Sequence, residues 1–250
     1  MAIDPIHQFE IHPLFKIGKI GSVEIVFTNS ALLMFISVAI VALLLIGTTG
    51  SRRLVPGRLQ SLAEVSYEFV ADTIRSSSGP EGLVYFPLVF SLFMFILVAN
   101  VIGLVPWVFT VTSQIIVTAA MALMVFVTVL IIGLWKHGLH FFKIFVPSNV
   151  PIYILPLVVF IEVISFLLRP VSHSVRLFAN MLAGHIALEV FGGFVILLAG
   201  AGLLGWFGAT LPVIMIVALT ALELLVAFLQ AYVFAILTCI YLNDTLHPGH

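Results

Sequence analysis

The sequence predicts an all-α integral membrane protein. We expect one N-terminal transmembrane helix, one interfacial amphipathic helix, a transmembrane hairpin, and two long, strongly tilted antiparallel membrane helices. Only 8% of the 250 residues are charged and 62% are hydrophobic, whereas soluble domains carry about 25% charged residues. The few charges are also separated by long apolar stretches. A chain of this composition cannot cover a water-facing surface, so its solvent is the bilayer.

The first span is placed by a gap between charges. Residues 1–28 form a polar N-terminal segment to which we assign no motif, and residues 30–47 form the span. No charge lies between Glu24 and Arg52, and an ionic group at bilayer depth is costly. A cleaved signal peptide would begin with a basic head, whereas here a charged segment precedes the apolar stretch. We therefore expect a span that the protein retains.

An interfacial helix is predicted at residues 58–76. Polar side chains recur every four residues on one of its faces: Gln60, Glu64, Glu68 and Asp72. Apolar side chains occupy the other face: Leu59, Leu62, Phe69, Val70 and Ile74. Such a helix lies along the membrane surface rather than across it. Ser61 and Glu64 have the spacing of a capping box, which predicts that the helix opens there.

A transmembrane hairpin is predicted at residues 83–135. The stretch from Gly82 to Trp135 carries no charge. It is long enough for two crossings of about 20 residues each, with a break near residues 106–114.

Two long helices are predicted within residues 151–242. The first covers about 151–199 and the second 211–242, with a glycine-rich turn through Gly202, Gly205 and Gly208 between them. Each exceeds the roughly 20 residues of a perpendicular crossing, so both must be strongly tilted or broken. No internal repeat is visible, and we treat residues 1–250 as one membrane domain. The Lys and Arg residues predict an outer N-terminus and an inner C-terminus.

The two long helices carry the polar residues that predict function. At 100° per residue, one face of the first helix collects Glu162, Ser165, Arg169, His173, Arg176 and Asn180, and the opposite side carries His185 and Glu189. On the second helix, Glu223 and Gln230 share a face. Matching depths on antiparallel helices then predicts three groups: outer His185, Glu189 and Glu223; central Arg176, Asn180 and Gln230; inner Glu162, Ser165 and Arg169.

This order predicts a proton path with an arginine in its middle. An arginine stays protonated at neutral pH, so Arg176 cannot relay protons. Its fixed charge instead repels hydronium and attracts a carboxylate, which comes from either Glu223 or another subunit. The candidates for proton relay are His185, Glu189 and Glu223, whose side chains exchange protons.

Several of these residues could instead have purely structural roles. Arg169 either anchors its helix or pairs with Glu162, and Asn180 and Gln230 could serve only as hydrogen-bonding contacts between helices.

Composition excludes other functions. The formal net charge is −1 and no basic cluster is present, so we expect no nucleic-acid partner. Cys239 is the only cysteine, which excludes an internal disulfide and a multi-thiolate metal site. The sequence contains no phosphate-binding loop, dinucleotide fingerprint or HExxH motif. We therefore expect no catalytic site, metal or cofactor.

Three motifs resemble those of subunit a of F-type ATP synthases, the membrane stator that faces the rotating ring of c subunits. They are RPVSHSVRLFANMLAGH at residues 169–185, LQAYVF at 229–234 with Tyr241-Leu, and Asn100 before the LVP of 104–106. The likeness covers roughly residues 30–245. His185 and Glu223 stand in the order of mitochondrial and related bacterial forms, since some bacterial members have the two residue types exchanged. Gly103 occupies a position that is acidic in some bacterial members.

The resemblance implies a function. The protein would provide two offset proton half-channels to the carboxylate of the c ring, separated by an essential Arg176, and so couple proton-motive force to rotation and ATP synthesis. Asn180, His185, Glu223 and Gln230 would line the half-channels and Glu162 the inner exit. The implied partners are the c ring, the b and b′ peripheral-stalk subunits and the rest of the complex.

Two other classes of function fit the sequence less well, and the transported ion and the membrane each have an alternative. A self-contained transporter would usually show repeated halves, which are absent from the sequence, and a passive scaffold leaves the ionic residues unexplained. The transported ion could be sodium instead of the proton. We favour the bacterial inner membrane because the N-terminal segment is long and polar, with the mitochondrial inner membrane as the alternative.

Overall fold

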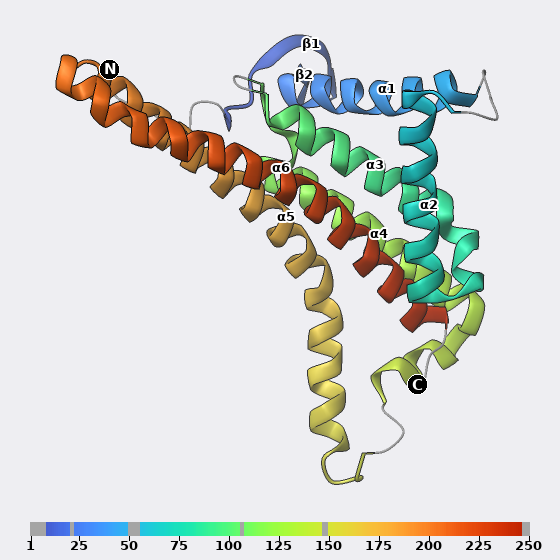
Figure 1. Cartoon of the computed structure of the whole chain (residues 1–250). Coiled ribbons are helices and arrows are strands. Elements are labelled where there is room, and N and C mark those ends of the chain that lie inside the picture. The colour runs from blue at the N-terminus through green and yellow to red at the C-terminus, as the bar shows by residue number, and fades with distance from the viewer. Residues whose placement is uncertain (1–8, 21–22, 50–55, 106–107, 147–149, 247–250) are drawn as a thin grey trace. The chain divides into compact units, whose positions relative to one another are not determined.

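The computed structural model describes residues 9–20, 23–49, 56–105, 108–146 and 150–246. Within these ranges the chain is mostly α-helical, and five of the described helices are long and apolar enough to cross a membrane (Figure 1). The predicted all-α membrane fold class is therefore confirmed. The chain divides into two compact units. The first unit holds residues 1–43, 95–114 and 177–230, and the second holds residues 44–94, 115–176 and 231–250.

The first unit begins with a β-hairpin that the sequence analysis did not foresee. Strands β1 (Pro13–Ile20) and β2 (Val23–Thr28) pair antiparallel, and they are the two arrows near the start of the chain in Figure 1. Both strands are rich in β-branched and aromatic residues, which favour pleated structure. The rings of Phe15 and Phe27 stack at 4.7 Å, and Phe27 also stacks on Phe35 of the following helix at 6.0 Å.

Charged side chains hold the same hairpin together. Glu24 lies 2.8 Å from Lys16 and 2.7 Å from Lys19. Hydrogen bonds from these two ammonium groups hold the pKa of Glu24 below its ordinary value of 4.5, and the bond from Lys16 has the larger effect. These three charges of the polar N-terminal segment, to which the sequence assigns no motif, are thus part of a folded element.

Helix α1 (Asn29–Thr49) follows the hairpin directly and covers the expected first span. Its start is capped locally, because the Asn29 side chain accepts a hydrogen bond from the Ser30 amide and the Thr28 hydroxyl accepts one from the Ala31 amide. These bonds satisfy backbone donors that a helix start leaves open.

Helix α2 (Arg58–Ser78) corresponds to the predicted interfacial helix, but its start differs from the prediction. The N-cap is Gly57, and within the described chain α2 has no side-chain capping bond. The predicted capping box was therefore wrong, and Ser61 lies inside the helix. On the apolar face, Val70 and Ile74 are buried, whereas Leu59 and Leu62 are exposed. The Ser78 hydroxyl donates to the carbonyl of Cys239 at 2.8 Å.

The region of the predicted transmembrane hairpin begins with a short 3₁₀ helix, η2 (Pro80–Tyr85). Helix α3 (Phe86–Gly103), the turn η3 (Val111–Ser113) and α4 (Ile115–His137) follow. Another 3₁₀ helix, η4 (Gly138–Phe145), follows α4. Gly133 lets α4 approach its neighbours, because a Cβ there would clash with the Phe141 ring and come 2.6 Å from Thr245.

The last two helices are α5 (Leu155–Ala199) and α6 (Leu203–Leu246), and α5 runs through Pro170 without interruption. Their first-unit portions lie side by side in Figure 1. The turn between them is shorter than predicted: Gly202 has φ +87°, and α6 already includes Gly205 and Gly208. A Cβ on Gly205 would clash with the Leu198 carbonyl oxygen. This glycine therefore serves close packing rather than breaking the helix.

Candidate functional site

A buried histidine and carboxylate face each other in the first unit. The Nε2 atom of His185 on α5 lies 3.5 Å from Oε1 of Glu223 on α6, and both side chains are about 95% buried. Two of the three residues of the predicted outer group are thus brought together. Glu189 is half-buried one helical turn beyond His185.

Gly184 makes room for this pair. A Cβ at position 184 would come 2.7 Å from Oε1 of Glu223, which is closer than van der Waals contact permits. The carboxylate therefore occupies space that only a glycine leaves open, next to the residue that it faces.

The turn between α3 and α4 supplies a third polar group. Oγ1 of Thr110 lies 2.9 Å from Nε2 of His185 and 3.4 Å from the carbonyl oxygen of Gly103, to which it donates. Thr110 is fully buried. Nearby on α3, the Asn100 side chain donates to the carbonyl of Ala227 on α6 at 3.1 Å, which fixes the packing of these two helices. Sequence analysis did not select Thr110.

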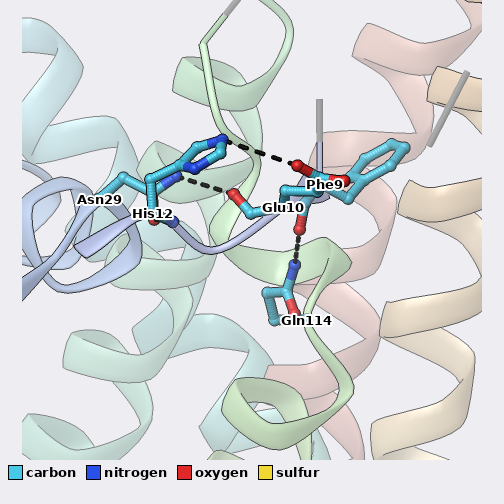
Figure 2. Close-up of polar contacts among 5 residues, drawn as sticks. All are labelled: Phe9, Glu10, His12, Asn29 and Gln114. Carbon is cyan, nitrogen blue, oxygen red and sulfur yellow. Dashed lines mark hydrogen bonds and ion pairs between the residues drawn. The ribbon is translucent and has the colours of Figure 1, made fainter. Parts of the chain in front are cut away.

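The N-terminal segment covers the histidine. The ring of Phe9 meets the His185 ring edge-on, with 6.2 Å between centroids. Figure 2 shows how the backbone around Phe9 is held: the Gln114 side chain donates to the carbonyl of Phe9 at 3.0 Å, and Asn29 bonds to Glu10 and His12. Glu10 and His12 form an exposed ion pair at 3.9 Å when the histidine is protonated.

The second unit contains another polar cluster. Nη1 of Arg169 on α5 donates to Oδ2 of Asp244 on α6 at 2.9 Å. The guanidinium also lies over the Tyr241 ring, 4.9 Å from its centroid, and over the Phe166 ring at 5.2 Å. The expected pairing of Arg169 with Glu162 is not observed, since among the described residues Glu162 takes part in no ion pair and Arg169 pairs with Asp244 instead.

His173 belongs to this second cluster. Its ring lies 3.8 Å from the Phe234 ring and 6.0 Å from the Tyr241 ring, measured between centroids. The side chain is buried, and its Nε2 atom has no hydrogen-bond partner within the described parts of the chain. The arrangement is a histidine enclosed mainly by aromatic rings.

The remaining predicted residues are more accessible. Ser165, Arg176 and Asn180 are exposed on α5, and Glu162 and Gln230 are half-buried. Arg176 makes no ion pair with any residue that the structure describes. Arg176 belongs to the second unit, whereas Asn180 and Gln230 belong to the first. The central group of these three residues stays a prediction.

Sequence reasoning missed Thr110, Asp244, Phe9 and Gln114. Helical periodicity relates residues within one helix, and it carries no information about a turn or an N-terminal segment that folds back on the helices. Asp244 was detectable in principle, because it lies near the end of the last helix, three residues after Tyr241, and Arg169 needed a partner.

Ionisable side chains enclosed between membrane-length helices define a multi-pass membrane protein of the ion-translocating class. Comparison with known proteins identifies its family. Residues 31–243 match the family described as ATP synthase A chain. The chain is 71% identical over 248 residues to the ATP synthase subunit a of Rhodopseudomonas palustris strain BisA53, with 99% of this chain and 100% of the relative covered.

Two further relatives agree with this match. The ATP synthase subunit a of Bradyrhizobium diazoefficiens is 68% identical and that of Nitrobacter winogradskyi 66% identical, covering 100% and 99% of this chain and the whole of each relative. The chain therefore belongs to the ATP synthase subunit a family, the proton-translocating stator subunit of the Fo sector. This confirms the resemblance found in the sequence. Subunits of this family are components of a larger complex.

Proposed function

We propose that this chain forms two offset proton half-channels that lead to the carboxylate of a c-subunit ring, and that Arg176 separates them. Protons entering one half-channel neutralise the ring carboxylate, and protons leave through the other after the ring has turned. The flow of protons down their gradient would thereby drive rotation and ATP synthesis. The chain itself would supply no phosphate chemistry.

The observation that carries this proposal is the buried pair of His185 and Glu223. Burying two ionisable groups is costly unless they interact, so a pair kept there points to a use for them, and both residue types can exchange protons. Both carboxylate oxygens of Glu223 and Oδ1 of Asn100 are buried without a hydrogen-bond partner in the described chain. Buried polar atoms that lack a partner in the protein are commonly hydrogen-bonded to water. This favours a hydrated path beside His185 and Glu223. Glu189 would extend the path outward, and Asn180 and Gln230 would line it toward Arg176.

The cluster around Arg169 and Asp244 suits the second half-channel. It combines a charged pair with His173 and Tyr241, and Ser165 and Glu162 precede it on α5. Along α5, Arg176 follows this cluster and precedes His185. An arginine between two polar routes blocks a direct proton leak, because its charge repels hydronium and it holds its own proton at neutral pH.

The exposure of Arg176 supports a partner that supplies its counter-ion. The side chain is exposed in the isolated chain and makes no ion pair with the described residues. An unneutralised guanidinium in a membrane is strongly unfavourable. A c-ring carboxylate is the counter-ion that we propose, with the b and b′ subunits as further neighbours in the complex. The relatives are alphaproteobacterial, which supports placement in the bacterial inner membrane.

The test is replacement of Arg176 by alanine in the assembled complex. ATP-driven proton pumping into inverted membrane vesicles should be lost, while passive proton leak is retained or increased. Arg75→Ala is the matched control, because Arg75 is exposed on α2 and, among the described residues, its ion pair is a local one with Asp72 at 2.8 Å. That variant should pump normally.

Unchanged pumping by the Arg176 variant would refute the proposal. A sodium requirement of ATP hydrolysis by the unmodified complex would instead show that the transported ion is sodium and not the proton.

A further inference from the structure

Among the described residues, the Thr110 hydroxyl does not make the capping hydrogen bond that its position at the start of η3 would allow. Thr110 occupies the N-cap position of η3 with φ −91° and ψ 111°, where a threonine usually accepts a hydrogen bond from a backbone amide two or three residues ahead. In the described turn this capping bond is not made. The Ser113 hydroxyl bonds to the Thr110 carbonyl at 2.7 Å instead. The Thr110 hydroxyl is left to join Gly103 and His185.

We propose that Thr110 is a positioning residue for proton transfer at His185: its hydroxyl holds the imidazole beside Glu223 and hydrogen-bonds to Nε2 in both of its protonation states. This inference rests on the proposed function, since it assigns a residue to the half-channel that contains His185.

The geometry allows the hydroxyl to serve both states. A hydroxyl carries one proton and two acceptor lone pairs. When Nε2 is protonated, the Thr110 hydroxyl accepts its hydrogen bond at 2.9 Å and donates its own proton to the Gly103 carbonyl at 3.4 Å. When Nε2 has lost its proton, rotation about the C–O bond turns the hydroxyl proton toward the ring. Neither state leaves the buried nitrogen without a hydrogen bond.

The transfer step balances simply. The proton on Nε2 of the imidazolium moves to Oε1 of the Glu223 carboxylate, which yields a neutral imidazole and a carboxylic acid. The two atoms are 3.5 Å apart, slightly beyond the 2.7–3.2 Å range of a direct N–H···O bond. The single N–H of Nε2 points either to the Thr110 hydroxyl or to Glu223, so transfer requires the ring to turn this N–H from Oγ1 toward Oε1 and to close the gap by a few tenths of an ångström. After the proton has left, the Thr110 hydroxyl donates to the vacant lone pair of Nε2.

Other groups around the ring do not perform this task. The titratable groups on neighbouring described elements are Glu223 on α6, Glu189 on α5 itself, and Glu10 and His12 in the N-terminal segment. Helix α3 and the sequence of the turn after it contain no charged residue. Phe9 covers the ring with an apolar edge. The position of Thr110 also depends on Gly103, because a Cβ there would come 2.7 Å from Cγ2 of Thr110.

The experiment compares Thr110→Val with Thr110→Ser in the complex reconstituted into liposomes. Valine fills the same volume without a hydroxyl, whereas serine keeps the hydroxyl. ATP-driven proton pumping should fall about tenfold in the valine variant, since a lost hydrogen bond of about 1.4 kcal/mol corresponds to that factor. It should stay within about twofold of normal in the serine variant. The midpoint of the pH dependence should move only in the valine variant.

Thr112→Val is the matched control. Thr112 is equally buried in the same turn, and its hydroxyl has no hydrogen-bond partner among the described residues. Proton pumping by the Thr112→Val variant should remain within about twofold of normal. Equal pumping by the valine and serine variants of Thr110, whether normal or reduced, overturns the inference, because the hydroxyl then has no specific role.

Two further comparisons keep the result decisive. If Thr110→Val does not assemble, Thr110→Ala removes the hydroxyl with a smaller side chain, and pumping equal to that of the serine variant overturns the inference. If Arg176→Ala abolishes pumping while removal of the Thr110 hydroxyl has no effect, only the role of Thr110 fails. If Arg176→Ala pumps normally, the proposed function fails first.

Discussion

Arg169 and Asp244 join α5 to the last turns of α6 through a bond of 2.9 Å between Nη1 and Oδ2. Both side chains are largely shielded, with 19% and 32% of their surface exposed. The guanidinium is also stacked against Tyr241. A charge-assisted bond held in this way has a fixed geometry, which exposed ion pairs usually lack.

The first prediction concerns the strength of this pair. Arg169→Ala and Asp244→Ala should each destabilise the purified protein, and the double variant should lose less than the sum of the two. We expect a coupling of about 1–2 kcal/mol in the free energy of unfolding. Denaturant titration of the four proteins in detergent measures it. A coupling near zero would mean that the bond does not hold α5 and α6 together.

A second prediction follows from the space beside Glu223. Gly184→Ala should displace the carboxylate from His185, because the added methyl group would come 2.7 Å from Oε1. Overpacking of this kind costs about 1–3 kcal/mol, so ATP-driven proton pumping should fall about tenfold. Alanine favours helix more than glycine does, so a weaker helix would not explain a loss. Gly192→Ala in the same helix is the control, since no described atom lies within 4 Å of its added Cβ.

The third prediction concerns the packing of α4. Gly133→Ala would place a methyl group against the Phe141 ring, where it clashes, and 2.6 Å from Thr245. We expect the free energy of unfolding to fall by about 1–3 kcal/mol. Gly47→Ala in α1, where the described structure leaves open space around the added Cβ, should be neutral or slightly stabilising. Equal stability of the two variants in denaturant titrations would contradict this packing.

A fourth prediction concerns the β-hairpin at low pH. Lys16 and Lys19 lower the pKa of Glu24 in the folded hairpin from its ordinary value of 4.5. The folded state therefore binds fewer protons there than the unfolded state, and Glu24 stabilises the hairpin at and above pH 4.5. That contribution is lost as the pH falls through the lowered folded pKa.

Carboxyl ¹³C NMR of the full protein in detergent measures this titration. The Glu24 midpoint should lie below 4.5 in the unmodified protein and return toward 4.5 when both Lys16 and Lys19 are replaced by alanine. A midpoint that does not respond to the replacements would exclude the two lysines as the cause.

The sequence predicts the helices well because hydropathy and charge depend on local composition. A bilayer excludes ions along the whole of a span, so the gap from Gly82 to Trp135 was sufficient to predict α3 and α4. Boundaries set by packing were less predictable. Gly205 looked like part of a loop, yet it lies in α6, where its missing side chain permits close contact with Leu198 of α5.

The candidate site was only partly accessible to sequence reasoning. Facing positions on two antiparallel helices can be matched by counting residues, and this brought His185 and Glu223 together. Thr110 lies in an irregular turn, and Phe9 lies in a segment whose path depends on contacts with Gln114 and Asn29. Such contacts depend on three-dimensional folding, and no periodic pattern reports them.

The contacts of Phe9 also impose an order on biosynthesis. The ribosome releases this residue long before Gln114 and His185, so neither the bond to the Phe9 carbonyl nor the covering of the imidazole can form while the first helix is being inserted. The N-terminal segment must wait until most of the chain has been translated. The contacts of Phe9 with Gln114 and His185 therefore form late, although Phe9 is synthesised before both of its partners.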